Sequence, residues 1–129
     1  MMFETELASA PNLAALLPTI PAPGTDYTSG PGTLTPVAGH PITNGVGTFM
    51  FTDYANQGAG TRAGATTLLT GSAVEMGAAW EQGAGRSVYL APLFVEKYSS
   101  YANENLLDNS QPDSVLLFMQ SLEWLGHNL

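Results

Sequence analysis

The chain contains no cysteine. This absence excludes disulfide bonds, thiolate metal ligands and a cysteine nucleophile together. Histidine and carboxylate residues are present, but no group of them has the spacing of a zinc site. We therefore predict that the protein carries neither a metal ion nor a cofactor.

Basic residues are almost as scarce. Arg62, Arg86 and Lys97 stand against eleven carboxylates, which gives a formal net charge of −8. Nucleic-acid backbones and anionic membrane surfaces both bind through clusters of lysine and arginine, and this chain has no such cluster. The composition thus excludes nucleic acid and membrane as partners, and leaves a carbohydrate or a protein ligand open.

Long apolar runs are absent as well. No stretch reaches the roughly 20 apolar residues of a membrane span, and the N-terminus from Met1 to Glu6 lacks the basic region of a secretory signal. The shortage of lysine, together with abundant glycine, threonine and alanine, favours an extracellular or cell-surface location.

Proline and glycine are concentrated in the first third of the chain. After a short helix predicted over Pro11–Leu17, six prolines fall between Pro18 and Pro41. We expect this stretch to be irregular, and to pack on its own body or to exchange between protomers. The predicted division is an N-terminal helix and arm over residues 1–41, and a compact half-domain over residues 42–129.

Strand patterns follow the arm. Alternation over Thr48–Thr52 places Phe49 and Phe51 on one face, and an apolar strand is expected over Ala65–Thr70. The segment from Tyr54 to Gly64 is rich in glycine and is expected to be a loop. Two further strands, over residues 77–81 and 86–90, flank the turn Gly83-Ala84-Gly85, which is typical of a β-hairpin.

The clearest helix is predicted over Ser114–His127, beginning after Asp113, which can cap its first amides. Apolar residues recur along it at steps of three and four. They are Val115, Leu116, Phe118, Met119, Leu122 and Leu125. We therefore predict an α/β fold, three-layer-like but truncated, with a small mixed sheet, a C-terminal β-hairpin and this long amphipathic helix.

Three residues are candidates for catalysis. His40 titrates near neutral pH and could act as a general base, or it could cap a turn before Pro41. Asp53 directly follows a strand, where functional side chains or an Asx turn are both expected. Glu81 faces Arg86 across the hairpin, so a cross-strand ion pair is the ordinary alternative to catalysis.

Three other residues are candidates for ligand binding. Tyr54 and Trp80 could stack on a sugar, and Arg86 could hold a polar group beside them. Aromatic residues in strands also serve as core, and that alternative stays open.

Four motifs follow one another in order along the chain. They are His40-Pro41-Ile42-Thr43-x-Gly45-Val46, Phe49-x-Phe51-x-Asp53-Tyr54, Trp80-x-x-Gly83-x-Gly85-Arg86-x-Val88-Tyr89-Leu90, and Leu116 to Trp124. Their order resembles the C-terminal half of class I glutamine-amidotransferase-like domains, with ThuA-like (trehalose-utilisation) domains nearest. The nucleophile half of that family has no counterpart here, and Leu90-Ala91-Pro92-Leu93 stands where the family has Leu-Gly-His.

Two functional hypotheses follow. The first is a non-catalytic module of amidotransferase-like ancestry that binds a carbohydrate or a protein and forms a homo-oligomer, because a half-domain leaves an edge or apolar face open. The second is a small hydrolase that acts on a glycoside or an ester through His40 and a nearby carboxylate. An enzyme should place His40 and a carboxylate together in a pocket, whereas a binding module should bury His40 or isolate it.

Overall fold

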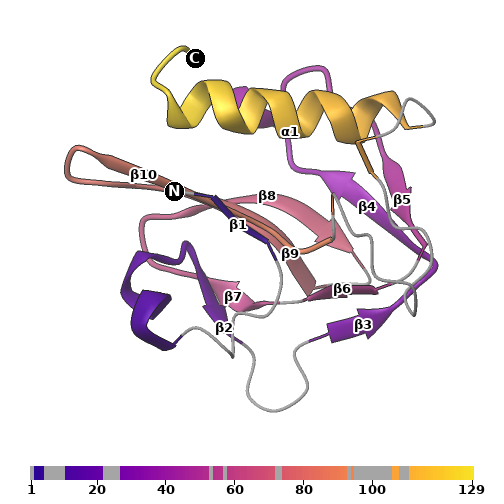
Figure 1. Ribbon diagram of the computed structural model, residues 1–129, viewed down its shortest axis with the longest axis horizontal. Helices are drawn as coiled ribbons and strands as arrows, with labels where there is room; N and C mark the ends of the chain where they lie inside the picture. Colours follow the sequence, from indigo (N-terminus) through magenta and orange to yellow (C-terminus); the bar gives the residue numbers. More distant parts are fainter. Residues whose placement is uncertain are drawn as a thin grey trace.

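A six-stranded sheet organises the molecule, with one long helix on one side and two short two-stranded sheets on the other (Figure 1). The computed structural model describes residues 2–4, 11–21, 27–52, 54–56, 58–71, 74–92, 94, 106–107 and 111–129. The sheet order is β1-β10-β9-β8-β4-β5. Its strands are β1 (Met2–Glu4), β4 (Gly32–Pro36), β5 (Phe49–Phe51), β8 (Thr66–Gly71), β9 (Val74–Gln82) and β10 (Gly85–Leu90).

The remaining elements surround this sheet. The two small sheets pair β2 (Thr19–Pro21) with β7 (Gly58–Thr61), and β3 (Tyr27–Ser29) with β6 (Tyr54–Asn56). The helical elements are the 3₁₀ helices η2 (Pro11–Leu16) and η3 (Pro41–Thr43) and the α-helix α1 (Pro112–Leu125).

The main sheet is mixed, as predicted. Strand β1 runs parallel to β10, and the other described pairs are antiparallel. The sheet curls into a half-barrel. The result is a broadly α/β fold that is richer in sheet than the predicted three-layer arrangement.

The hairpin and the Phe49 strand are confirmed. Strands β9 and β10 pair with Arg86 opposite Glu81, and Gly83 in the turn adopts φ 61°, which a residue without a side chain accepts readily. Phe49 and Phe51 are buried while Met50 between them is exposed. Local sequence pattern was sufficient to predict both elements. The turn glycines indicated the hairpin, and the alternation of apolar residues indicated a strand with one face on the core.

The expectation of an irregular arm over residues 18–41 is wrong. Strands β2 and β3 pair with β7 and β6, and β4 joins the main sheet between β5 and β8. The prolines do not prevent this, because Pro21 and Pro36 each occupy the last position of their strand. The segment packs on its own body, which was one of the two arrangements expected for it.

The predicted loop from Tyr54 to Gly64 is also wrong, since β6 and β7 occupy most of it. Glycine-rich composition suggested no regular structure, but pairing with the strands of the arm imposes extended backbone there. Residues 95–105 lie outside the described residues.

The C-terminal helix is confirmed, but its buried face differs from the predicted stripe. The buried residues are Ser114, Leu117, Ser121 and Trp124, whereas several residues of the stripe are exposed. Each buried serine hydroxyl donates to a backbone carbonyl, for example Ser121 to the Leu117 carbonyl at 2.8 Å, so burial leaves no hydroxyl unpaired. The same face contacts η3 and β10 through Trp124, which meets His40 and Arg86.

The core fills the space beneath α1 and within the half-barrel. Its largest fully buried side chains are Tyr89, Phe94, Leu17, Leu34, Ile42, Leu68, Leu69, Met76, Leu90, Leu106 and Leu117. Among the helices of the described ranges, none combines the length and the apolarity needed to span a membrane.

Candidate functional site

His40 begins the short helix η3 as its N-cap residue. Its backbone is extended (φ −111°, ψ 142°), and its Nδ1 atom accepts a hydrogen bond from the Ile42 amide at 3.2 Å. Pro41 follows at the first helical position, where its fixed φ is favourable and no amide donor is lost. The His-Pro pair therefore builds a capped turn, which is the structural alternative predicted for it.

The imidazole ring of His40 packs against α1. It meets the Trp124 ring edge-to-face, with 5.1 Å between centroids and 65° between planes. Trp124 is buried in the face of α1 that covers the sheet. The ring contact joins η3 to the last turn of the helix.

Arg86 reaches the same tryptophan from strand β10. Its Nε atom donates to Glu81 Oε1 at 2.7 Å, and its Nη1 atom donates to the Trp124 carbonyl at 2.5 Å. The guanidinium carbon lies 4.7 Å from the centroid of the Trp124 ring. A cation is favourable at this point because the carbonyls at the C-terminus of a helix carry partial negative charge.

The electrostatics of this cluster favour a neutral histidine. Burial lowers the pKa of His40, the Glu81 carboxylate raises it by less, and the Arg86 guanidinium lowers it further. A neutral ring whose Nδ1 accepts from Ile42 carries its proton on Nε2. The lone pair of Nδ1 is thus engaged by the backbone of η3.

An open hollow lies beside this cluster. It has a volume of about 480 Å³ and is lined by residues of the segment 38–45, His40 among them. Among the residues that the structure describes, no carboxylate belongs to its lining, and Glu81 lies outside it. Within the ranges that the structure describes, no three histidine or acidic side chains converge into a group that could hold a metal ion.

The structure therefore brings together His40, Glu81 and Arg86, whereas Trp80 lies apart from them. Trp80 neighbours Glu81 in β9, and alternate side chains of a strand point to opposite faces, so Trp80 lies on the face away from α1. Tyr54 belongs to β6, although its side chain is not among those described, and Asp53 lies outside the described residues.

Trp124 was not predicted as a member of the site. It looked like one more apolar residue near the end of an amphipathic helix. Its position in the sequence was the one indication of this role. Trp124 lies in the last turn of the predicted helix, two residues before Gly126, where an aromatic ring can contact residues that pack against the end of the helix.

A second polar group is centred on Glu75. The pairs Leu69–Gly77 and Thr70–Glu75 leave Met76 as an extra residue in β9, a bulge that reverses the side-chain alternation. Glu75 is consequently buried against β2 and β7, where its Oε2 atom hydrogen-bonds the Thr19 hydroxyl. Burial raises the pKa of Glu75, against smaller opposing effects of Thr19 and Gly77.

The Thr19 hydroxyl also lies 3.2 Å from the Gly60 carbonyl oxygen. A hydroxyl has one proton, so both contacts are satisfied together when Glu75 is protonated and donates to Thr19. Gly58 makes room for this arrangement, because a Cβ atom there would overlap Thr19 and Glu75. The group is a buried polar link between the β2–β7 sheet and β9.

Comparison with known proteins gives fold relatives only. No protein-family model matches the chain, and no curated protein matches it. The cytoplasmic protein STM3548 of Salmonella typhimurium has a similar structure, with a TM-score of 0.71 and 22% identity over 88% of this chain and 45% of that one. The cytoplasmic protein STM1381 of Salmonella typhimurium LT2 gives a TM-score of 0.63 and 15% identity over 94% and 46%. This chain thus spans less than half of each relative, and the similarity concerns the fold alone.

Proposed function

We propose that this domain is a non-catalytic module that binds a protein partner. The observation that carries the proposal is the engagement of His40: its Nδ1 atom caps η3 and its ring packs on Trp124. A general base must offer a lone pair to substrate, and here the accepting nitrogen is held by a backbone amide. Descent from amidotransferase-like or ThuA-like domains remains a hypothesis carried by the motifs alone.

The arrangement of the other predicted residues supports binding rather than hydrolysis. The Arg86 guanidinium is shared between Glu81 and the carboxyl-terminal end of α1. Its role there is to fix the helix on the sheet. The Glu81 carboxylate, the candidate partner of His40 in hydrolysis, is therefore already paired with a cation.

A protein ligand is better supported than a carbohydrate. A sugar platform needs aromatic and polar side chains on one surface, but Trp80 and Arg86 lie on opposite faces of the sheet. The exposed apolar side chains of α1 provide instead a continuous surface of the kind that proteins cover on association.

The hydrolase hypothesis keeps one supporting observation, the electrostatic interaction between His40 and Glu81. A panel of chromogenic esters and glycosides, assayed with wild type, His40→Ala and the control His127→Ala, separates the two functions. We expect no turnover above buffer in any of the three proteins, and a lower melting temperature in His40→Ala only. Turnover by wild type and His127→Ala that vanishes in His40→Ala would overturn the proposal, provided that circular dichroism shows His40→Ala still folded.

A further inference from the structure

The segment formed by η2 and β2, residues 11–21, is attached to the body of the protein by a short ladder. Strand β2 pairs with β7 and, among the described strands, with no other, and the register between the two shifts after Ile20. We call this stretch the η2–β2 segment. In Figure 1 it lies at the margin of the molecule, across the main sheet from α1. A segment held in this way can open locally while the rest of the protein stays folded.

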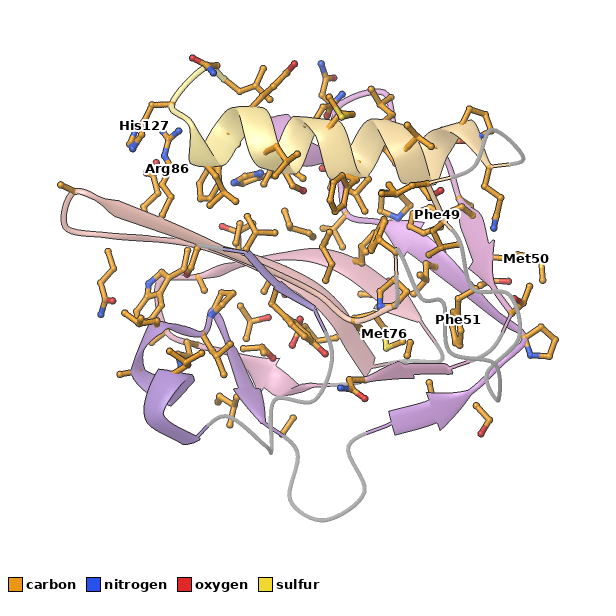
Figure 2. All side chains as sticks on the ribbon, in the orientation of Figure 1. Phe49, Met50, Phe51, Met76, Arg86 and His127 are labelled. Atoms are coloured by element: carbon orange, nitrogen blue, oxygen red, sulfur yellow. The ribbon has the colours of Figure 1, made fainter. Side chains whose placement is uncertain are left out.

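A buried carboxyl group adds a side-chain attachment to this ladder. The Oε2 atom of Glu75, in β9, hydrogen-bonds the Thr19 hydroxyl of β2. The bulge at Met76 turns Glu75 towards β2 and β7. Side chains fill the space between the main sheet and the two small sheets in Figure 2, where Met76 is labelled. Glu75 thus lies in the interface that holds the η2–β2 segment on the main sheet.

The proton of Glu75 completes the hydrogen bonds of this interface. The Thr19 hydroxyl contacts two oxygen atoms, one of the Glu75 carboxyl and the Gly60 carbonyl oxygen at 3.2 Å. A protonated Glu75 donates to Thr19, and Thr19 donates to Gly60. Once Glu75 loses its proton, a single hydroxyl proton remains for two acceptors, and one of them is unpaired.

The second carboxyl oxygen makes the charged form still less favourable. Glu75 Oε1 is buried and has no hydrogen-bond partner among the described residues. A buried carboxylate with too few donors costs free energy, which is recovered when the group reaches water. Opening of the η2–β2 segment removes Thr19 from the carboxyl and admits water in its place.

The described strands beside Glu75 carry no cation directed at it. Strands β2, β7 and β8 contain no titratable residue. Arg62 follows β7 directly in the chain, and the charges of the hairpin, Glu81 and Arg86, pair with each other on the face towards α1. Burial raises the pKa of Glu75, and the hydrogen bonds from Thr19 and Gly77 lower it by less.

We propose that Glu75 is a pH-sensitive switch that holds the η2–β2 segment closed on the main sheet while it is protonated and releases the segment when it loses its proton. The inference goes beyond the proposed binding function and does not depend on it. Opening withdraws Leu17, which is fully buried in the core, and breaks the hydrogen bond of 3.0 Å from the Arg62 amide to the Pro18 carbonyl.

The expected pH dependence follows from proton linkage. Each opening releases one proton between the ordinary carboxyl pKa of 4.5 and the raised pKa of Glu75. The ratio of open to closed molecules should therefore rise about tenfold per pH unit in this window and level off above it.

Thiol labelling measures the opening, because the chain has no cysteine and each substitution introduces a single thiol. Leu17→Cys places the thiol in the η2–β2 segment and Leu117→Cys places it beneath α1, both at fully buried positions. Met119→Cys, at a position that is 49% exposed, gives the rate of a free thiol. The rate with 4,4′-dithiodipyridine is measured from about pH 4 to pH 8 and divided by that of Met119→Cys at the same pH.

We expect this relative rate to rise with pH in Leu17→Cys as the linkage predicts. Low concentrations of urea should change it little, because a local opening exposes little surface, whereas labelling of Leu117→Cys should need global unfolding and increase steeply with urea. Adding Glu75→Gln to Leu17→Cys should abolish the rise. Adding Glu123→Gln, at an exposed position of α1, should leave it unchanged.

Hydrogen exchange of the Arg62 amide gives the same information in the unsubstituted chain, and it decides the question if circular dichroism shows Leu17→Cys unfolded. Its rate, divided by the intrinsic exchange rate at each pH, should rise in the same window. An opening that does not increase with pH overturns the inference, and so does an increase that persists with Glu75→Gln. Labelling of Leu17→Cys that depends on urea as steeply as that of Leu117→Cys also overturns it, because the whole protein would then unfold.

Discussion

The side-chain amide of Gln111 forms two hydrogen bonds with the backbone of Met50. Its Oε1 atom accepts from the Met50 amide and its Nε2 atom donates to the Met50 carbonyl, both at 2.7 Å. Met50 lies in β5, the last strand of the main sheet on that side. A side chain thus occupies the place of a further strand and blocks part of an edge that could pair with another chain.

Removing this amide should weaken the edge. We expect Gln111→Ala to lower the free energy of unfolding by about 1–2 kcal/mol, because two net hydrogen bonds are lost. Gln111→Glu should be at least as harmful, because a carboxylate accepts from the amide but repels the carbonyl. Urea denaturation measures both variants, with the exposed Gln82→Ala as control. A Gln111→Ala protein as stable as wild type would mean that the two bonds contribute nothing.

Replacing Arg86 should cost much more stability than replacing Glu81, its partner in the ion pair. Glu81 is 60% exposed and Arg86 only 16%, so water screens the ion pair from the glutamate side. We expect Glu81→Gln to cost about 0.5 kcal/mol or less. Arg86→Met should cost about 1–3 kcal/mol, because it also removes the bond to the Trp124 carbonyl and the contact with the indole ring.

Thermal and urea unfolding of both variants and of the double variant measure this difference. If Glu81→Gln costs as much as Arg86→Met, the ion pair rather than the helix contact stabilises the cluster.

His40 should make the fold less stable in acid. Burial lowers its pKa below the ordinary value of 6.5; the Glu81 carboxylate opposes this effect, and the Arg86 guanidinium adds to it. Between the lowered pKa and 6.5 the unfolded chain binds more protons than the folded one, so the free energy of unfolding rises with pH across this window. Protonation of Nδ1 also removes the acceptor that caps the Ile42 amide.

We expect His40→Gln to flatten this part of the profile, and the control His127→Gln to keep it. The measurement is the urea midpoint from pH 4 to 8, a range of about two units on each side of an ordinary histidine pKa. An unchanged profile in His40→Gln would assign the slope to another group.

Glu75 should change the pH dependence of stability in the direction opposite to that of His40. Its pKa is raised above 4.5 by burial, so between 4.5 and the raised value the folded chain binds more protons than the unfolded one. The free energy of unfolding therefore falls as pH rises through that window. Glu75→Gln should remove this loss and be more stable than wild type above it, because its uncharged side-chain amide can replace the contact with the Thr19 hydroxyl.

Glu123→Gln, at an exposed position of α1, is the control and should leave the slope unchanged. The prediction is contradicted if Glu75→Gln loses stability at every pH, which would show that the carboxylate itself is required.

Gly58 should tolerate no larger side chain. We expect Gly58→Ala to cost about 1–3 kcal/mol, because the added methyl group must displace Thr19 and Glu75. Gly85→Ala, in the hairpin where a Cβ atom meets only one carbonyl at ordinary contact distance, is the matched control. Equal melting temperatures for the two variants would show that Thr19 and Glu75 can move aside for the added methyl group without loss of stability.

Several elements of the fold could be predicted from local pattern alone. The β9–β10 hairpin, the strand of Phe49 and Phe51, and the presence of α1 each follow from turn glycines or apolar periodicity within one segment, although α1 begins two residues before the predicted start and ends two before the predicted end. Local pattern could not predict the four strands of the two small sheets, β2, β3, β6 and β7. Segments rich in proline or glycine become strands only when a distant segment supplies their hydrogen bonds.

The same division holds for the candidate site. The sequence by itself determined which residues carry charge or titrate near neutral pH, and hence that His40, Glu81 and Arg86 were candidates. Tertiary structure decided that His40 and Arg86 meet at Trp124, with Glu81 paired to Arg86, because η3, the hairpin and α1 converge only after the sheet is assembled. It also decided which face of α1 is buried, because the face that carries Ser114, Leu117, Ser121 and Trp124 packs on the sheet whereas Leu116, Met119 and Leu122 are exposed. Burial and contact are properties of the assembled layers, whereas periodicity is a property of one segment.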